Sequence, residues 1–263
     1  TMNLDLTKKI IIVTGGAKGI GFGVASALAA EGASPVIIGR DEKDNALVVS
    51  MLKEAGGTAF AFKAELNQPS HCKRVVQLVI EKFKRIHGLV NNAGLNDGVS
   101  LEFGSYELFL KSLHNNLVHY YLLAQYALPE LKKSRGTIVN ITSKTAETGQ
   151  GNTSAYAAAN GGRNALTREW AVELLKYGIR VNAVVVGECW TAQYEKWIGS
   201  FPDPLDKLNE ITSRIPFESR MTTVDEVGNT VAFLLSNKSS HTTGQLIYVD
   251  GGYVHLDRAL ANA

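Results

Sequence analysis

The chain has 263 residues, of which 45% are apolar, and its 27 basic residues nearly balance its 25 acidic residues to leave a net charge of +2. This composition excludes disorder and gives no electrostatic reason to expect a nucleic acid or a membrane surface as partner. No run approaches the ~18 consecutive apolar residues of a membrane span, and the N-terminal segment lacks the apolar core of a signal peptide. Cys72 and Cys189 form no CxxC pair, which favours the reducing cytoplasm.

Short apolar runs alternate with segments of helical periodicity along the chain. In chain order the pattern predicts a strand at 9–14, a helix at 20–30, a strand at 35–39, a helix at 41–55, a strand at 58–64, a helix at 69–86, a strand at 88–92, a long helix at 105–133, a strand at 136–142, a helix at 155–177, a strand at 179–186, a helix at 224–235 and a strand at 246–249. Residues 190–213 show no clear period and are expected to form an irregular, variable substrate loop.

Strands that are apolar throughout and alternate with helices are typical of a parallel sheet covered on both faces. We therefore expect a single α/β domain over residues 1–263 with a doubly wound parallel (Rossmann) sheet. In such a sheet, ligands bind at the carboxyl ends of the strands. The residues that directly follow each strand are therefore the candidates for function.

Glycines are frequent, 25 against 6 prolines, and they gather after the first predicted strand, where the run from Thr14 to Gly21 reads TGGAKGIG. Glycines let a backbone pass close to a pyrophosphate, and the following helix directs free N–H groups and its positive dipole end at that charge. Close packing of helix on strand is the alternative explanation. Placed between a strand and a helix, the loop predicts a dinucleotide site at Gly15, Lys18, Gly19, Ile20 and Gly21.

The end of the second strand indicates which dinucleotide binds. NAD-binding sheets of this type carry an acid here for the ribose hydroxyls, but Gly39 stands at this position. Arg40 follows it, and Arg40 and Lys18 together suit the 2′-phosphate of NADP. NAD, with Asp41 on the ribose, is the alternative. Further cofactor contacts are assigned after the third and sixth strands, to Glu65, Leu66, Gly187 and Thr191.

Several motifs in order, at matching separations, resemble the short-chain dehydrogenase/reductase family over essentially the whole chain. They are the loop TGGAKGIG, the element Asn91-Asn92-Ala93-Gly94, Asn116 in the long helix, Ser143 with Tyr156 thirteen residues later, and the turn Val249-Asp250-Gly251-Gly252. The resemblance implies hydride transfer between a nicotinamide and a carbon that bears oxygen. It implies that Tyr156 exchanges the proton, Ser143 binds the substrate oxygen and Asn116 supports a proton relay, while the cofactor contacts Asn92, Ala93, Gly94 and Tyr156.

The sequence departs from the family at one catalytic position. Four residues after the tyrosine the family has a lysine, which lowers the tyrosine pKa and holds the nicotinamide ribose, and this chain has Asn160. We keep Asn160 as a catalytic and cofactor-binding candidate, although an amide supplies no charge. Bringing a tyrosine pKa from ~10 to neutral pH takes about 4 kcal/mol. Arg163 shares a helix face with Tyr156, but it lies ~10.5 Å further along the axis, so we do not expect it to compensate. We predict a rate ~10²-fold or more below that of a lysine-bearing parent.

Several blocks, including residues 92–98, 148–153 and 251–258, resemble more narrowly the L-fucose dehydrogenases, which oxidise the anomeric hydroxyl of L-fucose to a lactone. A sugar pocket needs hydrogen-bonding side chains and an aromatic face. The substrate candidates are Asn96, Ser143, Gln150, Tyr156, Glu188 and Trp190.

The six histidines show no strong ligand spacing, so no metal is expected. The family resemblance implies a homotetramer.

Two alternatives stay open at this stage. Asn160 is compatible with a catalytically weak or inactive cofactor-binding homologue, or with an engineered variant. A general alcohol or steroid dehydrogenase is the other alternative, because a fold does not determine its substrate.

Overall fold

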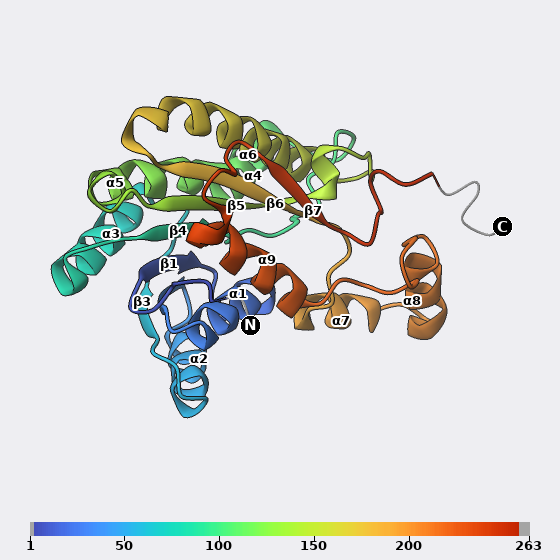
Figure 1. Ribbon diagram of the computed structural model, residues 1–263. Helices are drawn as coiled ribbons and strands as arrows, with labels where there is room; N and C mark the ends of the chain where they lie inside the picture. The colour runs from blue at the N-terminus through green and yellow to red at the C-terminus, as the bar shows by residue number, and fades with distance from the viewer. Residues whose placement is uncertain (1–2, 258–263) are drawn as a thin grey trace.

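The computed structural model describes residues 3–257, which form a seven-stranded sheet with helices on both faces (Figure 1). The strand order is β3-β2-β1-β4-β5-β6-β7, and every neighbouring pair is parallel. The strands are β1 (Ile10–Thr14), β2 (Ser34–Gly39), β3 (Phe60–Lys63), β4 (Gly88–Asn91), β5 (Thr137–Ser143), β6 (Arg180–Val186) and β7 (Leu246–Val249). This confirms the predicted single-domain, doubly wound parallel sheet.

The helices lie in two layers. One face of the sheet carries α1 (Gly19–Ala30), α2 (Glu42–Glu54) and α9 (Val224–Leu235), and the other carries α3 (Pro69–Phe83), α4 (Tyr106–Leu113), α5 (His119–Ser134) and α6 (Ser154–Glu173) (Figure 1). Short helical turns complete the chain: η1 (His114–Val118), η2 (Lys144–Ala146), η3 (Leu175–Tyr177) and η4 (Asn237–Ser239).

Each layer has its own apolar core because the strands are apolar on both faces. Val76, Leu123 and Trp170 belong to the core between the sheet and α3, α5 and α6. Val24 and Val231 belong to the opposite core, where α1 packs on α9. The strand order reverses beside β1, between β1 and β4, and this reversal leaves a crevice at their carboxyl ends where ligands bind in open α/β sheets.

The structure corrects two of the predicted elements. The long helix predicted at 105–133 is divided into α4 and α5 by a π-helical turn, η1, which contains Asn116. A single π-helical turn is a local change inside an otherwise continuous helix, and a period averaged over the whole segment does not reveal it. The segment expected to be irregular contains α7 (Ala192–Ile198) and α8 (Pro204–Thr212). Each begins at a residue whose side chain caps the helix, Thr191 for α7 and Asp203 for α8. These caps fix where the two helices start in a segment whose apolar periodicity is weak.

Among the helices of residues 3–257, none combines the length and the apolar character needed to cross a membrane.

Candidate active site

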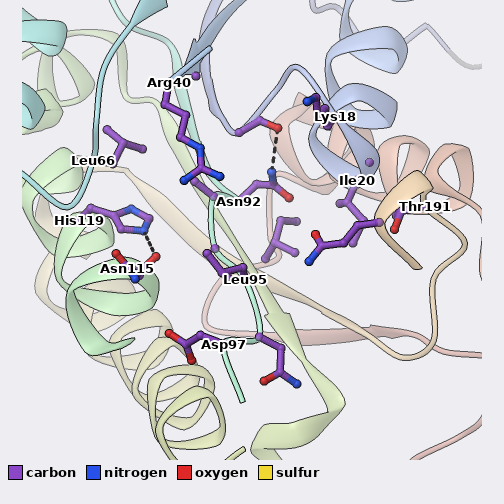
Figure 2. Close-up of a pocket in the computed structure, with 18 of the residues that line it drawn as sticks. Lys18, Ile20, Arg40, Leu66, Asn92, Leu95, Asp97, Asn115, His119 and Thr191 are labelled. Atoms are coloured by element: carbon purple, nitrogen blue, oxygen red, sulfur yellow. Dashed lines mark hydrogen bonds between the residues drawn. The ribbon is translucent and has the colours of Figure 1, made fainter. Parts of the chain in front are cut away.

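A cleft of about 1100 Å³ opens at the carboxyl ends of the strands. The segments that follow β1 to β6 all contribute to its wall. Figure 2 shows Lys18 and Ile20 of the glycine loop near Thr191, with Arg40 across from them and Asn92 between. The cleft therefore lies where the sheet topology predicts a ligand site.

The N-terminus of α1 is built to accept an anion. Lys18 is its N-cap residue but makes no side-chain capping bond, and the first turn contains no acidic residue. Gly15 has a φ of +63°, and a Cβ on Gly21 would collide with the Gly15 carbonyl oxygen. Only glycines allow the loop to lie this close to the start of the helix. Free N–H groups at a helix N-terminus fit the pyrophosphate of a dinucleotide.

The loop after β4 is held against the glycine loop by Thr14. The buried Thr14 hydroxyl accepts hydrogen bonds from the backbone N–H groups of Asn92, at 2.8 Å, and Ala93, at 3.0 Å. The Asn92 side chain in turn donates to the Thr14 carbonyl at 2.8 Å. These bonds fix the two loops relative to each other and form the floor of the cleft.

The end of the cleft beside β2 carries charges of both signs. Arg40 lines it, while the Lys18 ammonium pairs with the Asp44 carboxylate at 2.5 Å. Asp41 caps α2 by accepting the N–H groups of Lys43 and Asp44, and the bond from Asp44 does most to lower the pKa of Asp41. Arg40 is therefore the cation at this end that makes no ion pair with any residue of the described range 3–257.

Ser143 and Tyr156 meet in the same cleft. Ser143 ends β5, and its hydroxyl accepts the N–H of Thr145 at 3.2 Å. Tyr156 is half-buried in the first turn of α6. Its hydroxyl makes no hydrogen bond to any residue between 3 and 257. The cleft therefore contains two hydroxyl side chains that can hydrogen-bond a ligand.

Asn160 and Asn116 are fully buried behind the wall of the cleft and do not line it. The Asn160 amide nitrogen donates to the Tyr156 backbone carbonyl at 2.9 Å, and its oxygen accepts from Arg163 at 3.0 Å. The Asn116 side-chain oxygen accepts the N–H of Leu95 at 2.8 Å. Both asparagines therefore hold backbone segments around the site.

The other predicted residues divide into two groups. The cleft is lined by Gly15, Lys18, Gly19, Ile20, Arg40, Glu65, Leu66, Asn92, Ala93, Gly94, Asn96, Ser143, Tyr156, Gly187 and Thr191. Four more do not line it, in addition to the two buried asparagines: Gly21, Gln150, Glu188 and Trp190.

Glu188 belongs to an internal ion pair. Its carboxylate pairs with Lys144 and accepts a hydrogen bond of 2.8 Å from the Tyr194 hydroxyl. The Lys144 ammonium lies 3.9 Å from the centre of the Tyr253 ring. Burial and the neighbouring Glu188 carboxylate raise the pKa of Tyr194, so its hydroxyl stays protonated and donates to Glu188.

Sequence reasoning did not assign His119, Arg163 or Tyr194 to the cleft, and all three line it. His119 lies at the start of α5, next to Asn115, whose carbonyl is 3.0 Å from its Nε2 atom (Figure 2). Burial lowers the pKa of His119 to about 3. For Arg163 a signal existed, because helical side chains lean toward the N-terminus of their helix and so bring an arginine back toward residues one turn earlier.

In the part of the chain from 3 to 257, no group of three or more His, Cys, Asp and Glu side chains is placed to hold a metal ion.

A glycine cradle, a tyrosine–serine pair and a doubly wound sheet define a nicotinamide-dependent oxidoreductase. A family model described as Enoyl-(Acyl carrier protein) reductase matches residues 15–254. The chain belongs to the short-chain dehydrogenase/reductase family, whose members use NAD or NADP.

Among curated proteins, the chain is 35% identical over 245 residues to an L-fucose dehydrogenase of Bos taurus, covering 93% of this chain and 88% of the relative. Among solved structures it is similar to Cj0485 dehydrogenase, with a TM-score of 0.94 and 44% identity over 98% of this chain and 99% of that one. It is also similar to the Thermoplasma acidophilum aldohexose dehydrogenase, with a TM-score of 0.87 and 28% identity, and 98% of each chain is covered.

Proposed function

We propose that this oxidoreductase is an NADP-linked dehydrogenase that oxidises the anomeric hydroxyl of a sugar such as L-fucose to a lactone. The observation that carries the proposal is the Tyr156 hydroxyl, which has no partner in residues 3–257 and shares the cleft with Ser143 and the glycine loop. The names of the bovine L-fucose dehydrogenase and the archaeal aldohexose dehydrogenase support a sugar as substrate.

In this proposal each side chain has a defined part. When bound, the nicotinamide accepts a hydride. The Ser143 hydroxyl donates a hydrogen bond to the substrate oxygen and orients it. The deprotonated Tyr156 oxygen takes the proton of the substrate hydroxyl. At the same time the C1–H bond breaks, the electron pair of that bond leaves with the hydrogen as the hydride, and a C=O bond forms at C1. The proton held by Tyr156 then passes to solvent.

NADP is favoured over NAD by Arg40, which lines the cleft beside β2. Lys18, the second predicted cation, is already paired with Asp44. A 2′-phosphate would therefore depend mainly on Arg40. Asp41 and Asp44 line the same end, and they favour the NAD alternative.

The substrate end is proposed to lie beside α7. Four aromatic rings follow one another along this segment, with centroid separations of 6.4 Å for Trp190 to Tyr194, 5.2 Å for Tyr194 to Trp197 and 5.0 Å for Trp197 to Phe201. Trp190 is 38% exposed. A partly exposed aromatic face suits a sugar, and Tyr194 of this series lines the cleft together with the polar Asn96. Gln150, Glu188 and Trp190 stay candidates that would need to move into the cleft.

The test is turnover with NADP⁺ and with NAD⁺ on L-fucose, other aldoses and secondary alcohols, followed by nicotinamide absorbance. We expect L-fucose to reduce the cofactor, and we expect this turnover to be lost in Tyr156→Phe and to fall ~10²-fold in Ser143→Ala. Turnover of secondary alcohols but not sugars would favour the general alcohol or steroid dehydrogenase. Cofactor binding without any turnover would favour the catalytically weak homologue that Asn160 suggests.

We further propose that the protein assembles as a homotetramer in the cytoplasm. Exposed apolar side chains on α4, on α6 and in the loop before α4, including Tyr106, Val172 and Phe103, support an interface between copies. Cys72 and Cys189 are free buried thiols, which is compatible with a reducing compartment. Light scattering after size-exclusion chromatography tests the assembly, and a monomer would contradict it.

A further inference from the structure

Arg163 is a buried cation without a counter-ion in the described chain. It is 3% exposed, and no Asp or Glu within residues 3–257 forms an ion pair with it. A buried charge is costly unless it is paired or fully hydrogen-bonded. Packing alone does not offset that cost, so the surroundings of the guanidinium decide its role.

Neutral groups hold the guanidinium in place. Its Nε donates to the Asn116 carbonyl at 2.6 Å, and its Nη1 donates to the Ile141 carbonyl at 3.2 Å and to the Asn160 side chain at 3.0 Å. The ring of Tyr120 lies 4.3 Å from the guanidinium carbon. The Nη2 atom is buried and makes no hydrogen bond within residues 3–257. The charge is therefore fixed in position and only partly satisfied.

The charge lies in the wall of the cleft that also contains the proposed reaction centre. Arg163 and Tyr156 both line the cleft, whereas Asn160 does not. A Cβ added to Gly94, in the loop expected to contact the cofactor, would lie 2.8 Å from Nη2. Asn160 connects the two residues, because it accepts from Arg163 and donates to the Tyr156 carbonyl.

We propose that Arg163 supplies the positive charge of the active site and stabilises the anionic form of Tyr156. In the family that the sequence resembles, this role belongs to a lysine at the position of Asn160. Asn160 is then a positioning residue, because it accepts from the Arg163 guanidinium and donates to the Tyr156 carbonyl. This inference rests on the proposed dehydrogenase function. It predicts that the replacement of lysine by Asn160 does not slow the enzyme, because Arg163 supplies the charge that the sequence alone left unassigned.

None of the neighbouring titratable groups within residues 3–257 forms an ion pair with Arg163. The elements around Arg163 carry His119, Tyr120, Tyr156, Asp97, Lys111 and Glu147. His119 stays neutral because burial lowers its pKa to about 3. Burial raises the pKa of Tyr120, and its hydroxyl donates to the Ile141 carbonyl. Asp97 accepts from Ser112 at 2.7 Å and Glu147 accepts from Asn164 at 2.9 Å, so neither is paired with Arg163.

The first experiment measures tyrosine ionisation by ultraviolet absorbance in the protein without cofactor or substrate. The transition that disappears in Tyr156→Phe identifies the site. In Arg163→Met this transition should move to higher pH by about one unit or more. Arg163→Lys should keep most of the effect. An unmoved transition in a folded Arg163→Met protein overturns the proposal. Arg180→Met is the matched control, because Arg180 is partly buried and donates to backbone carbonyls, such as that of Leu234, but it begins β6, at the end of the strand opposite the cleft.

The second experiment moves the charge to the family position. Arg163→Met should lower kcat/KM at pH 7 by ~10²-fold, and adding Asn160→Lys to that variant should restore most of the loss. Asn160→Lys alone should give no acceleration, because the charge is already present. An acceleration of tenfold or more by Asn160→Lys alone overturns the proposal, even if Arg163→Met does not fold.

The two experiments separate this inference from the proposed function. If the protein oxidises no sugar or alcohol, the proposed function fails. The tyrosine titration still decides whether Arg163 acts on Tyr156, because that measurement uses neither cofactor nor substrate.

Discussion

The Thr14 hydroxyl at the end of β1 accepts a hydrogen bond of 2.8 Å from the backbone N–H of Asn92, which follows β4. Ala93 donates to the same oxygen. One side chain therefore joins the two loops that form the floor of the cleft. Thr14, the first residue of the glycine motif, therefore also links the ends of β1 and β4.

Thr14→Val keeps the shape of the side chain but leaves two backbone donors without their acceptor. We expect the free energy of unfolding to fall by about 2 to 3 kcal/mol and cofactor affinity to fall with it, as measured by urea denaturation and calorimetric titration. Thr142→Val is the control, because the buried Thr142 hydroxyl has no hydrogen-bond partner in the described chain. Equal losses of stability in the two variants would show that the Thr14 bonds contribute little.

Arg40→Ser tests the choice of cofactor. If Arg40 binds the 2′-phosphate, its loss should raise KM for NADP⁺ about tenfold and leave KM for NAD⁺ within about twofold, because only NADP carries that group. Lys43→Ser is the matched control, since Lys43 is exposed on α2 and does not line the cleft. A parent enzyme that already prefers NAD⁺, with no change in Arg40→Ser, would support Asp41 as the ribose ligand instead.

Glu188→Gln tests whether the Lys144–Glu188 pair anchors the fold of the substrate region. The side chains are 7% and 16% exposed, so the substitution leaves a buried ammonium without its partner. We expect a loss of about 3 kcal/mol or more in the free energy of unfolding. Glu81→Gln, which breaks a pair whose side chains are 58% and 62% exposed, should cost less than about 1 kcal/mol. If Glu188→Gln leaves stability intact but weakens sugar binding, Glu188 is a substrate ligand.

His119 makes stability depend on pH. Burial lowers its pKa from 6.5 to about 3. Between these values the unfolded chain binds a proton that the folded protein does not, so stability falls as pH falls. From pH 7 to pH 5 this one residue should cost about 2 kcal/mol.

The measurement compares urea denaturation at pH 7 and pH 5 for the parent and for His119→Gln. The variant should lose about 2 kcal/mol less over this interval than the parent does. His71→Gln, which changes an exposed histidine, should behave like the parent. An identical pH dependence in His119→Gln and the parent would mean that His119 does not carry the effect.

Local sequence was enough to locate most of the chain's elements. Strand β7 and helix α9 have the predicted bounds, because their apolar patterns end at clear stop signals. Helices α7 and α8 were not predicted, since both are short and their caps, Thr191 and Asp203, give a weaker signal than periodicity. The π-helical turn at Asn116 leaves no periodic trace at all.

The sequence by itself determined the sheet, the glycine cradle and the tyrosine–serine pair, because each depends on residue types at fixed positions relative to a strand end. It also showed that a lysine is missing at residue 160. Only the tertiary structure decided where the Arg163 guanidinium lies. The Arg163 side chain turns back along α6 and donates to Asn160 and to the carbonyls of Asn116 and Ile141, which belong to other elements. Contacts of that kind depend on how helices pack around the sheet, and linear spacing does not contain that information.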